Sequence, residues 1–567
     1  MQMGLRGSLP IRNHFRALIL GAEIILSLSA PLRAQNPAPT SPPPTSVESN
    51  SVATFHAASR LVLVDVVATD KNGKFVPGLT PDDFTVLEDG KPQRISGFSA
   101  HVEDIAARSL PALQLPPHQY TNFTTLPPDR AVNIILLDML DMPRLDQSYA
   151  RQQMLKFLAA MPPGQTVALF ALNSRLTMIQ GFTGSSESLV AAAKRLLLDN
   201  STSHLRTEKD DQQNWEIPEN PLGLPGDPTV LLNDALSLEQ EYQGEVRTVT
   251  ILQSLQAIAR SVSGYAGRKN LLWLSSEFPF RLDPEFNREG QSSHVRDHHS
   301  EILETASLMA ASQMAVYPID VNGLVADTPF STGRVLTRWD RQDAMEDIAR
   351  QTGGVAFSGS NDLKSAMLRS IQEGTNYYTV AYAPTNPDWN GTYRRIEIKV
   401  KRPHVDLRHR SGYYAVAQPE FKGDQAAKML ASAMLPTVPE STMLLLRVQV
   451  LPPDQDHRAV RIDYAVEAQD IAFTDVSGKR KHAAIDFMAA AWDKHNQDVG
   501  HATDIMETSI RPEQFEQVMK TGLPMHQELE LKPGSYLLRL GVIDRGSQKI
   551  GTVDVPLTIP ASQISKK

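Results

Sequence analysis

The feature that most constrains the fold is a series of apolar runs of strand length, separated by segments with helical spacing. Nearly continuous apolar runs are typical of parallel strands that are buried on both faces of a sheet. The intervening segments place apolar residues every three or four positions, as amphipathic helices do. This alternation predicts an open α/β fold, with a doubly wound and mostly parallel sheet. The runs are 132–138, 166–172, 270–276 and 314–320, with a weaker one at 353–358 and an antiparallel edge strand at 176–182.

Patterns typical of β structure flank this central segment, which we place at 128–374. Residues 55–105 hold apolar runs broken at the turns Asn72-Gly73 and Asp89-Gly90, which predicts a small β module. A Pro-rich connector that ends near Arg130 follows it. Residues 375–417 return to the β pattern, and because the two segments border the central domain, we expect them to complete one discontinuous module. Alternating strands over 430–567 predict a C-terminal β-sandwich of immunoglobulin-like type, with its last two strands joined at Asp544-Arg545-Gly546.

The N-terminus has the pattern of a secretory signal peptide, which we place at 1–34. A basic start and a short apolar run lead to Ala34, a small residue suited to cleavage. A linker rich in Pro, Ser and Thr follows at 35–54. No later stretch has the ~20 apolar residues of a spanning helix. We therefore expect an exported protein, periplasmic or extracellular, with no transmembrane segment after cleavage.

Composition and motifs narrow the function. The 567 residues include no cysteine and carry a formal net charge of −8, without a basic stripe, so no nucleic-acid partner is expected. The sequence lacks the Gly-x-Ser-x-Gly elbow, the phosphate-binding Gly-x-x-x-x-Gly-Lys loop, the Gly-x-Gly-x-x-Gly fingerprint and the His-Glu-x-x-His zinc motif. We therefore expect a protein that is not an enzyme and that requires no cofactor.

Several segments resemble those of one family. They read LVLVDVVATDKNGKFVPGLTPDDFTVLEDGKPQRI, VNIILLDML, GRKNLLWLSSEFP, VYPID, IARQTGGVAF, NYYTVAYAP and HRSGYYA, between about Arg60 and Ala415. The chain resembles the VWFA-related acidobacterial domain family, whose central domain is of von Willebrand factor A (Rossmann-like) type. The resemblance implies an exported adhesion or scaffold protein that binds a protein or cell-envelope ligand. We expect this contact near the loops at 138–146 and 275–299.

The resemblance also implies a metal-ion-dependent adhesion motif, Asp-x-Ser-x-Ser, after the first core strand. Here Asp138 matches the first ligand, but Leu140 and Met142 occupy the two Ser positions. Mg²⁺ or Mn²⁺ binding would need a nonstandard set of oxygen ligands. The candidates are Asp138, Asp141, Ser275 and Glu277. The alternative interpretation is that Asp138 caps the loop or helix that follows it.

Two further features leave alternatives open. His294 and His298 are spaced to share one helix face, which would suit a metal-dependent hydrolase, although a solvated loop explains the same polar segment. Besides an adhesion or scaffold protein and a hydrolase, the third interpretation of the whole chain is a purely structural envelope spacer. A group of five tyrosines could form either a recognition surface or a core with its rim: Tyr377, Tyr378, Tyr382, Tyr413 and Tyr414.

Overall fold

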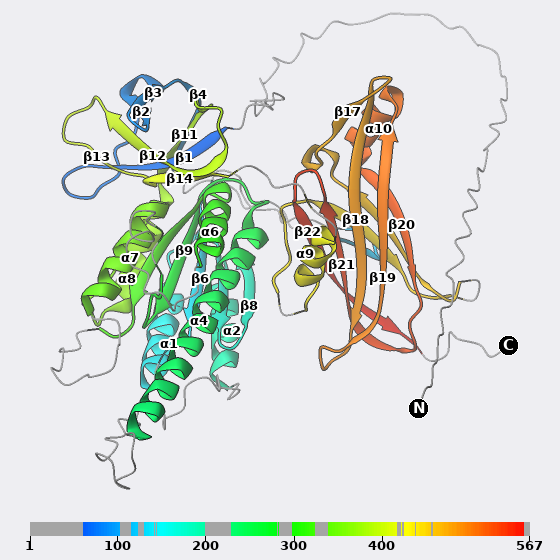
Figure 1. The fold of residues 1–567 in the computed structure, drawn as a ribbon, viewed down its shortest axis with the longest axis horizontal. Helices are drawn as coiled ribbons and strands as arrows, with labels where there is room; N and C mark the ends of the chain where they lie inside the picture. Colours follow the sequence, from blue (N-terminus) through cyan, green and yellow to red (C-terminus); the bar gives the residue numbers. More distant parts are fainter. Residues whose placement is uncertain are drawn as a thin grey trace, which may run out of the picture. The chain divides into compact units, whose positions relative to one another are not determined.

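The protein is described here from a computed structural model, drawn in Figure 1. Residues 59–567 form one compact unit. The predicted signal peptide (1–34) and linker (35–54) lie outside the described residues. The structure describes residues 61–102, 115–122, 130–140, 142, 144–198, 228–280, 282, 298–323, 338–416, 421, 424–436, 438–454 and 457–560.

A five-stranded mixed sheet forms the centre of the α/β domain, from β6 (Val132–Asp138), β7 (Val167–Leu172), β8 (Leu176–Thr183), β9 (Lys269–Ser275) and β10 (Met314–Asp320). The strand order is β10-β9-β6-β7-β8. Neighbouring strands run parallel except β8, which is antiparallel to β7. These five predicted strands are confirmed to within one residue of their bounds. The weaker strand at 353–358 is wrong: Gly353 (φ 80°) ends a helix as a turn, and the segment makes only an isolated bridge, from Phe357 to Ile319.

Helices pack against both faces of this sheet (Figure 1). On one face are α1 (Arg144–Ala159), α2 (Ser186–Leu198) and α8 (Leu363–Thr375). On the other are α4 (Pro228–Val262), α6 (His299–Ala311) and α7 (Arg338–Thr352). Alternate residues of β6 serve the two faces, since Ile135 and Leu137 join the core under α1 while Ile134 and Leu136 join the core under α4. This double burial explains why the strands read as continuous apolar runs.

A separate β domain is built from strands that precede and strands that follow the α/β domain in the sequence. One sheet has the order β13-β1-β11-β4 and the other β14-β12-β2-β3. β1 pairs antiparallel with β11, and β2 with β12, so strands about 300 residues apart in sequence share their hydrogen bonds. The bounds are β1 Val62–Thr69, β2 Phe84–Glu88, β3 Lys91–Gln93, β4 Ile95–His101, β11 Tyr377–Tyr382, β12 Asn390–Val400, β13 Asp406–Arg408 and β14 Gly412–Val416.

Two sheets with a shared apolar core form the C-terminal β-sandwich. One has the order β20-β16-β15-β5, and the other β17-β18-β21-β22 with β19 also paired to β18. The predicted final hairpin is confirmed by the β21·β22 pairing. The helices are α9 (Gln425–Ala433) and α10 (Pro512–Thr521). The strands are β15 Leu446–Leu451, β16 Val460–Val466, β17 Thr474–Val476, β18 Arg480–Trp492, β19 Asp498–Ile510, β20 Leu523–Leu529, β21 Gly534–Asp544 and β22 Ile550–Ile559.

The segment expected to be a plain connector supplies one strand to this sandwich. β5 (Gln119–Thr121) pairs antiparallel with β15. The side chain of Asn122 reinforces the join, because its amide donates to the carbonyl oxygens of Ser441 and Leu444. Three residues are too few to show the periodicity that predicts a strand. Pairing with the edge of β15 explains why this segment is extended.

No helix in the described ranges has both the length and the apolar character needed to span a membrane.

Candidate functional site at the carboxyl edge of the central sheet

The candidate site lies where three neighbouring strands of the central sheet end. β6 ends at Asp138, β9 at Ser275 and β10 at Asp320, and the parallel register sets Asp320 beside Ser275. These polar residues therefore form a row across one edge of the sheet. In open α/β sheets, ligands bind beyond the carboxyl ends of the strands.

Asp138 is buried, and its carboxylate accepts hydrogen bonds from three neutral groups among the described residues. Oδ1 accepts from the backbone N–H of Leu140 (3.2 Å). Oδ2 accepts from the indole N–H of Trp273 (3.1 Å) and from the hydroxyl of Ser275 (3.0 Å). A cation at Oδ2 would have to displace both of these donors, because an N–H or O–H proton already occupies the position it needs.

The loop after Asp138 turns its side chains inward. Leu140 is 1 % exposed and packs in the core under α4, while Met142 is 2 % exposed and packs in the core under α1. These are the positions at which the related motif has hydroxyl ligands. Two apolar side chains that each serve a different core offer no oxygen to a metal, so the residues present do not fit the standard site.

The other two proposed ligands are less closely involved. Glu277 meets Ser275 through its backbone: Ser275 Oγ lies 2.8 Å from the Glu277 carbonyl oxygen and accepts from the Glu277 N–H at 3.3 Å. Asp141 lies outside the described residues. Thus the structure brings Asp138 and Ser275 into direct contact and joins Glu277 to them only by main-chain atoms.

Our sequence reasoning missed Trp273 and Asp320. Asp320 is buried, and its Oδ1 accepts from both the backbone and the side-chain N–H groups of Asn322, each at 2.9 Å. The Asn322 amide also donates to the Ser276 carbonyl oxygen (2.8 Å), which links β10 to the end of β9. The signal was present, since MAVYPID ends in Asp just as VNIILLD does. No sequence signal marks Trp273 as the donor to Asp138.

Asp138 and Asp320 are separated by one strand. Their backbones are therefore about 10 Å apart, twice the spacing of neighbouring strands. Direct ligation of Mg²⁺ at about 2.1 Å by both carboxylates would require them to converge over Ser275. No group of three or more Asp, Glu or His side chains placed to hold a metal occurs within the described ranges. What the row does is hold the loops at this edge in place through hydrogen-bonded carboxylates.

The histidine pair can be placed only in part. His294 lies outside the described residues. His298 occupies the N-cap position of α6, and its carbonyl oxygen accepts from Ile302 N–H (3.0 Å). Its side chain is only 9 % exposed, and Nδ1 is buried with no hydrogen-bond partner among the described residues. The expectation of a solvated loop is therefore wrong at His298, because the ring packs inside the domain.

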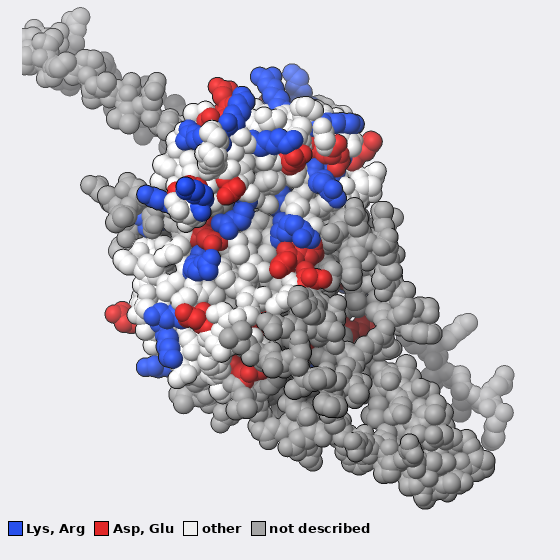
Figure 2. All heavy atoms as spheres, turned by 90° about the vertical axis from the view of Figure 1, so that its left-hand side faces the viewer, with Lys and Arg blue, Asp and Glu red and all other residues white. Residues whose placement is uncertain are grey.

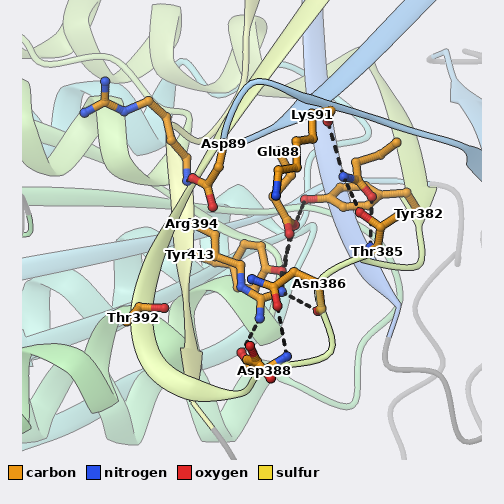
Figure 3. Close-up of polar contacts among 12 residues, drawn as sticks. Glu88, Asp89, Lys91, Tyr382, Thr385, Asn386, Asp388, Thr392, Arg394 and Tyr413 are labelled. Carbon is orange, nitrogen blue, oxygen red and sulfur yellow. Dashed lines mark hydrogen bonds and ion pairs between the residues drawn. The ribbon is translucent and has the colours of Figure 1, made fainter.

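A second polar cluster, in the β domain, is closed by its own contacts (Figure 3). Arg394 Nη1 lies 3.3 Å from Glu88 Oε1, and both residues are buried. The hydroxyls of Tyr382 and Tyr413 each donate to Glu88 Oε2 at 2.8 Å. Burial and the Glu88 carboxylate raise the pKa of both tyrosines, so they stay protonated donors. Arg394 also donates to the carbonyl oxygens of Asn386 and Asp388. This cluster fixes the loop between β11 and β12.

The five tyrosines considered as a recognition surface are all buried. Tyr378 packs with Phe75 and Phe98 in the core of the β domain. The Tyr377 hydroxyl accepts a hydrogen bond from the backbone N–H of Arg268 at 3.0 Å. The interpretation as core is confirmed. Strand positions rich in aromatic residues here serve packing between and within the domains.

On the face of the molecule in Figure 2, acidic and basic side chains are interspersed. The described part of this face carries no continuous basic area of the kind that binds nucleic acid.

Comparison with known proteins gives no family assignment and only weak similarities to solved structures. No family model matches the chain, and no curated protein matches its sequence. Among solved structures, an aerotolerance-related membrane protein from Bacteroides fragilis is 12 % identical, with 43 % of this chain and 99 % of that chain covered and a TM-score of 0.22. Proximal thread matrix protein 1 from the mussel byssus is 13 % identical, covers 43 % and 47 %, and has a TM-score of 0.22. Human Sec24c is 10 % identical, covers 60 % and 52 %, and has a TM-score of 0.24.

Proposed function

We propose that the chain is an exported interaction protein of adhesion or scaffold type, whose central domain is a doubly wound von Willebrand A-type domain with a degenerate metal-ion-dependent adhesion motif. It binds a protein or cell-envelope ligand without a cation. The observation that carries the proposal is the closed environment of Asp138, whose carboxylate accepts from Trp273, Ser275 and Leu140 N–H. An adhesion domain built on these residues must use its surface loops rather than a shared metal.

The position of the contact follows from the fold. Ligands of open α/β sheets bind beyond the carboxyl strand ends, where the loops after β6 and β9 emerge. In the described part of that edge, the polar groups are carboxylates held by hydrogen bonds, and the hydroxyl of Ser275, which donates to Asp138, is buried. This arrangement supports recognition rather than a chemical reaction.

The proposal is tested by calorimetric titration of the full chain with Mg²⁺ and with Mn²⁺, beside the variant Asp138→Asn. We expect no binding heat from either protein. Saturable binding by the wild type that is lost in Asp138→Asn would show that Asp138 recruits a cation and would overturn the metal-independent mode.

The placement of the contact is tested by capture from envelope extracts. We expect the wild type to retain the same ligand with and without EDTA, and Glu277→Arg to weaken retention, since Glu277 is the part-exposed acidic residue of a loop whose Phe278 and Phe280 belong to the core. The control is Lys494→Glu, a charge reversal in the exposed hairpin loop between β18 and β19 of the sandwich. Loss of capture in EDTA, or unchanged capture by Glu277→Arg, would contradict the proposal.

A metal-dependent hydrolase that uses His294 and His298 is the competing proposal, and the buried Nδ1 of His298 without a partner is the observation that favours it. It requires metal-stimulated hydrolysis of model esters or peptides that disappears in both His294→Ala and His298→Ala. A spacer without any ligand would show neither hydrolysis nor saturable capture.

A further inference from the structure

A cavity of about 40 Å³ lies on the seam between the β domain and the α/β domain, away from the carboxyl edge of the sheet. The β domain contributes residues of β1, β12 and β14 to its wall, and the α/β domain contributes residues of α6, α7, the start of β10 and Arg268, which precedes β9. Direct bonds hold the seam together: Tyr414 donates to the Leu282 carbonyl oxygen (2.9 Å), and Ser411 N–H donates to that of Arg350 (3.2 Å). The cavity is therefore a defined space between two joined domains.

Arg268 is the first of two arginines in the cavity wall. It precedes β9 and is 1 % exposed, yet every acceptor of its guanidinium is neutral. Nε donates to Asn270 Oδ1 (3.1 Å), and Nη2 donates to the Tyr317 hydroxyl (3.2 Å) and to the Gly353 carbonyl oxygen (2.8 Å). A buried cation is ordinarily paired with an anion, because hydrogen bonds to neutral groups only partly replace its lost hydration.

Arg410 is the second arginine, and it has fewer partners. Its Nη2 donates to the Leu63 carbonyl oxygen (2.9 Å), and its guanidinium lies 5.6 Å from the centre of the Tyr413 ring. Nε is buried and has no acceptor in the described part of the chain. Burial lowers the pKa of Arg410, as expected for a guanidinium that lacks a sufficient counter-charge.

The one carboxylate in the cavity wall does not neutralise both arginines. Asp65 Oδ1 accepts from the Gln313 amide (3.0 Å) and from the Thr379 hydroxyl (2.8 Å). Burial lowers the pKa of Arg268, but Tyr317 and Asp65 outweigh this effect and the pKa is raised overall, whereas at Arg410 Asp65 only partly opposes the lowering by burial. Asp65 makes no ion pair within 4.0 Å of either guanidinium group. The wall therefore carries two cations and one anion, an excess of one positive charge.

One part of the remaining wall is apolar, and the rest includes Gln313, Gln351, Thr352 and three tyrosines. The apolar part is formed by Leu282, Ala306, Met309, Ala310 and Met314. The volume suits about three water molecules. A ligand that matches both the charged part and the apolar part of the wall is small, carries a single negative charge and ends in a short alkyl group. Guanidinium groups recognise carboxylates through paired N–H donors.

We propose that this cavity binds a short monocarboxylate, of the size of acetate or propionate, with its carboxylate received by Arg268 and Arg410 and its alkyl end against the apolar wall. This site is independent of the interaction proposed for the carboxyl edge. The bound anion supplies the missing counter-charge at the seam and so holds the β domain and the α/β domain together.

The test is calorimetric titration of the full chain with acetate and propionate in a carboxylate-free HEPES buffer, with propionamide as the neutral analogue and chloride and phosphate as inorganic anions. We expect saturable binding of the two carboxylates only. Arg410→Gln should weaken propionate binding about tenfold or more, since a charged hydrogen bond is lost. The matched control is Arg408→Gln, whose arginine pairs with Glu373 at 3.0 Å and does not line the cavity.

Ala310→Leu supplies a second variant, which keeps both arginines and fills the space from α6. It should exclude propionate while leaving the melting temperature without ligand close to that of the wild type. The proposal is overturned if neither carboxylate binds the folded wild type, if phosphate or chloride binds as tightly as propionate, or if Ala310→Leu binds propionate unchanged.

Discussion

Two arginines lie near the same aromatic ring and have opposite surroundings. Arg394 and Arg410 lie 5.9 Å and 5.6 Å from the centre of the Tyr413 ring. Each has a buried Nε without an acceptor among the described residues, but Arg394 also has the Glu88 carboxylate and two carbonyl oxygens as partners, whereas Arg410 has one carbonyl oxygen. The difference teaches that a carboxylate in direct contact, rather than residue type, separates a structural ion pair from a candidate binding site.

The largest effect is expected from removing the carboxylate that pairs with Arg394. Glu88→Gln leaves Arg394 buried without a counter-ion and should lower the free energy of unfolding by about 3–5 kcal/mol, measured by urea denaturation. The control is Glu397→Gln on the same sheet, where an exposed glutamate pairs with Lys399, and it should change stability by less than ~1 kcal/mol. Equal effects of the two variants would remove the distinction between a buried and an exposed pair.

The next prediction concerns Lys269, a buried cation that directly follows Arg268 in the sequence. Burial lowers the pKa of Lys269 to about 8 from its ordinary 10.5, and its ammonium donates to the Tyr265 carbonyl oxygen. Between these two pKa values the unfolded chain holds more protons than the folded chain. The free-energy cost of burying the charged Lys269 ammonium is therefore full below pH 8 and falls as the pH rises. The free energy of unfolding should increase by up to about 3 kcal/mol from pH 8 to 10.5 through this residue.

The measurement is the difference in unfolding free energy between the wild type and Lys269→Met across that range. The gain with pH should be absent in Lys269→Met and present in Lys399→Met, which changes an exposed lysine. Parallel curves for the wild type and Lys269→Met would show that the buried lysine pays no penalty at this seam.

The smallest effect is expected at Asp138, whose hydrogen-bond donors among the described residues are neutral. Asp138→Ala leaves the Trp273 N–H and the Ser275 hydroxyl without this acceptor and should cost about 1–3 kcal/mol, measured by thermal or urea unfolding. Asp138→Asn retains an acceptor oxygen and should cost less. If Asp138→Ala were as stable as the wild type, these hydrogen bonds would not account for the conformation of the loop.

Much of the α/β domain could be predicted from local pattern. The strands ending at Asp138 and Asp320 were located because a strand buried on both faces must be apolar along its length. The strand β5 could not be found this way, because its extended conformation depends on pairing with β15, more than 300 residues later. The strand expected at 353–358 failed for a local reason that the pattern concealed, since Gly353 adopts a positive φ and ends α7.

The candidate sites divide in the same manner. The sequence identified Asp138 as a residue at a strand end and Leu140 and Met142 as poor metal ligands, since side-chain chemistry is a local property. It could not identify Trp273 as a hydrogen-bond donor to Asp138. It also could not predict that Arg268 and Arg410, 142 positions apart, line the same cavity.

The sequence by itself thus determined the five strands of the central sheet and which side chains can accept, donate or carry charge. Only the tertiary structure decided which charged groups meet: Glu88 with Arg394, Asp138 with the hydroxyl of Ser275, and Arg268 and Arg410 in the wall of one cavity with Asp65. The physical reason is that hydrophobic periodicity acts over a few residues, whereas the cost of burying a charge depends on every group that packing brings within a few ångströms.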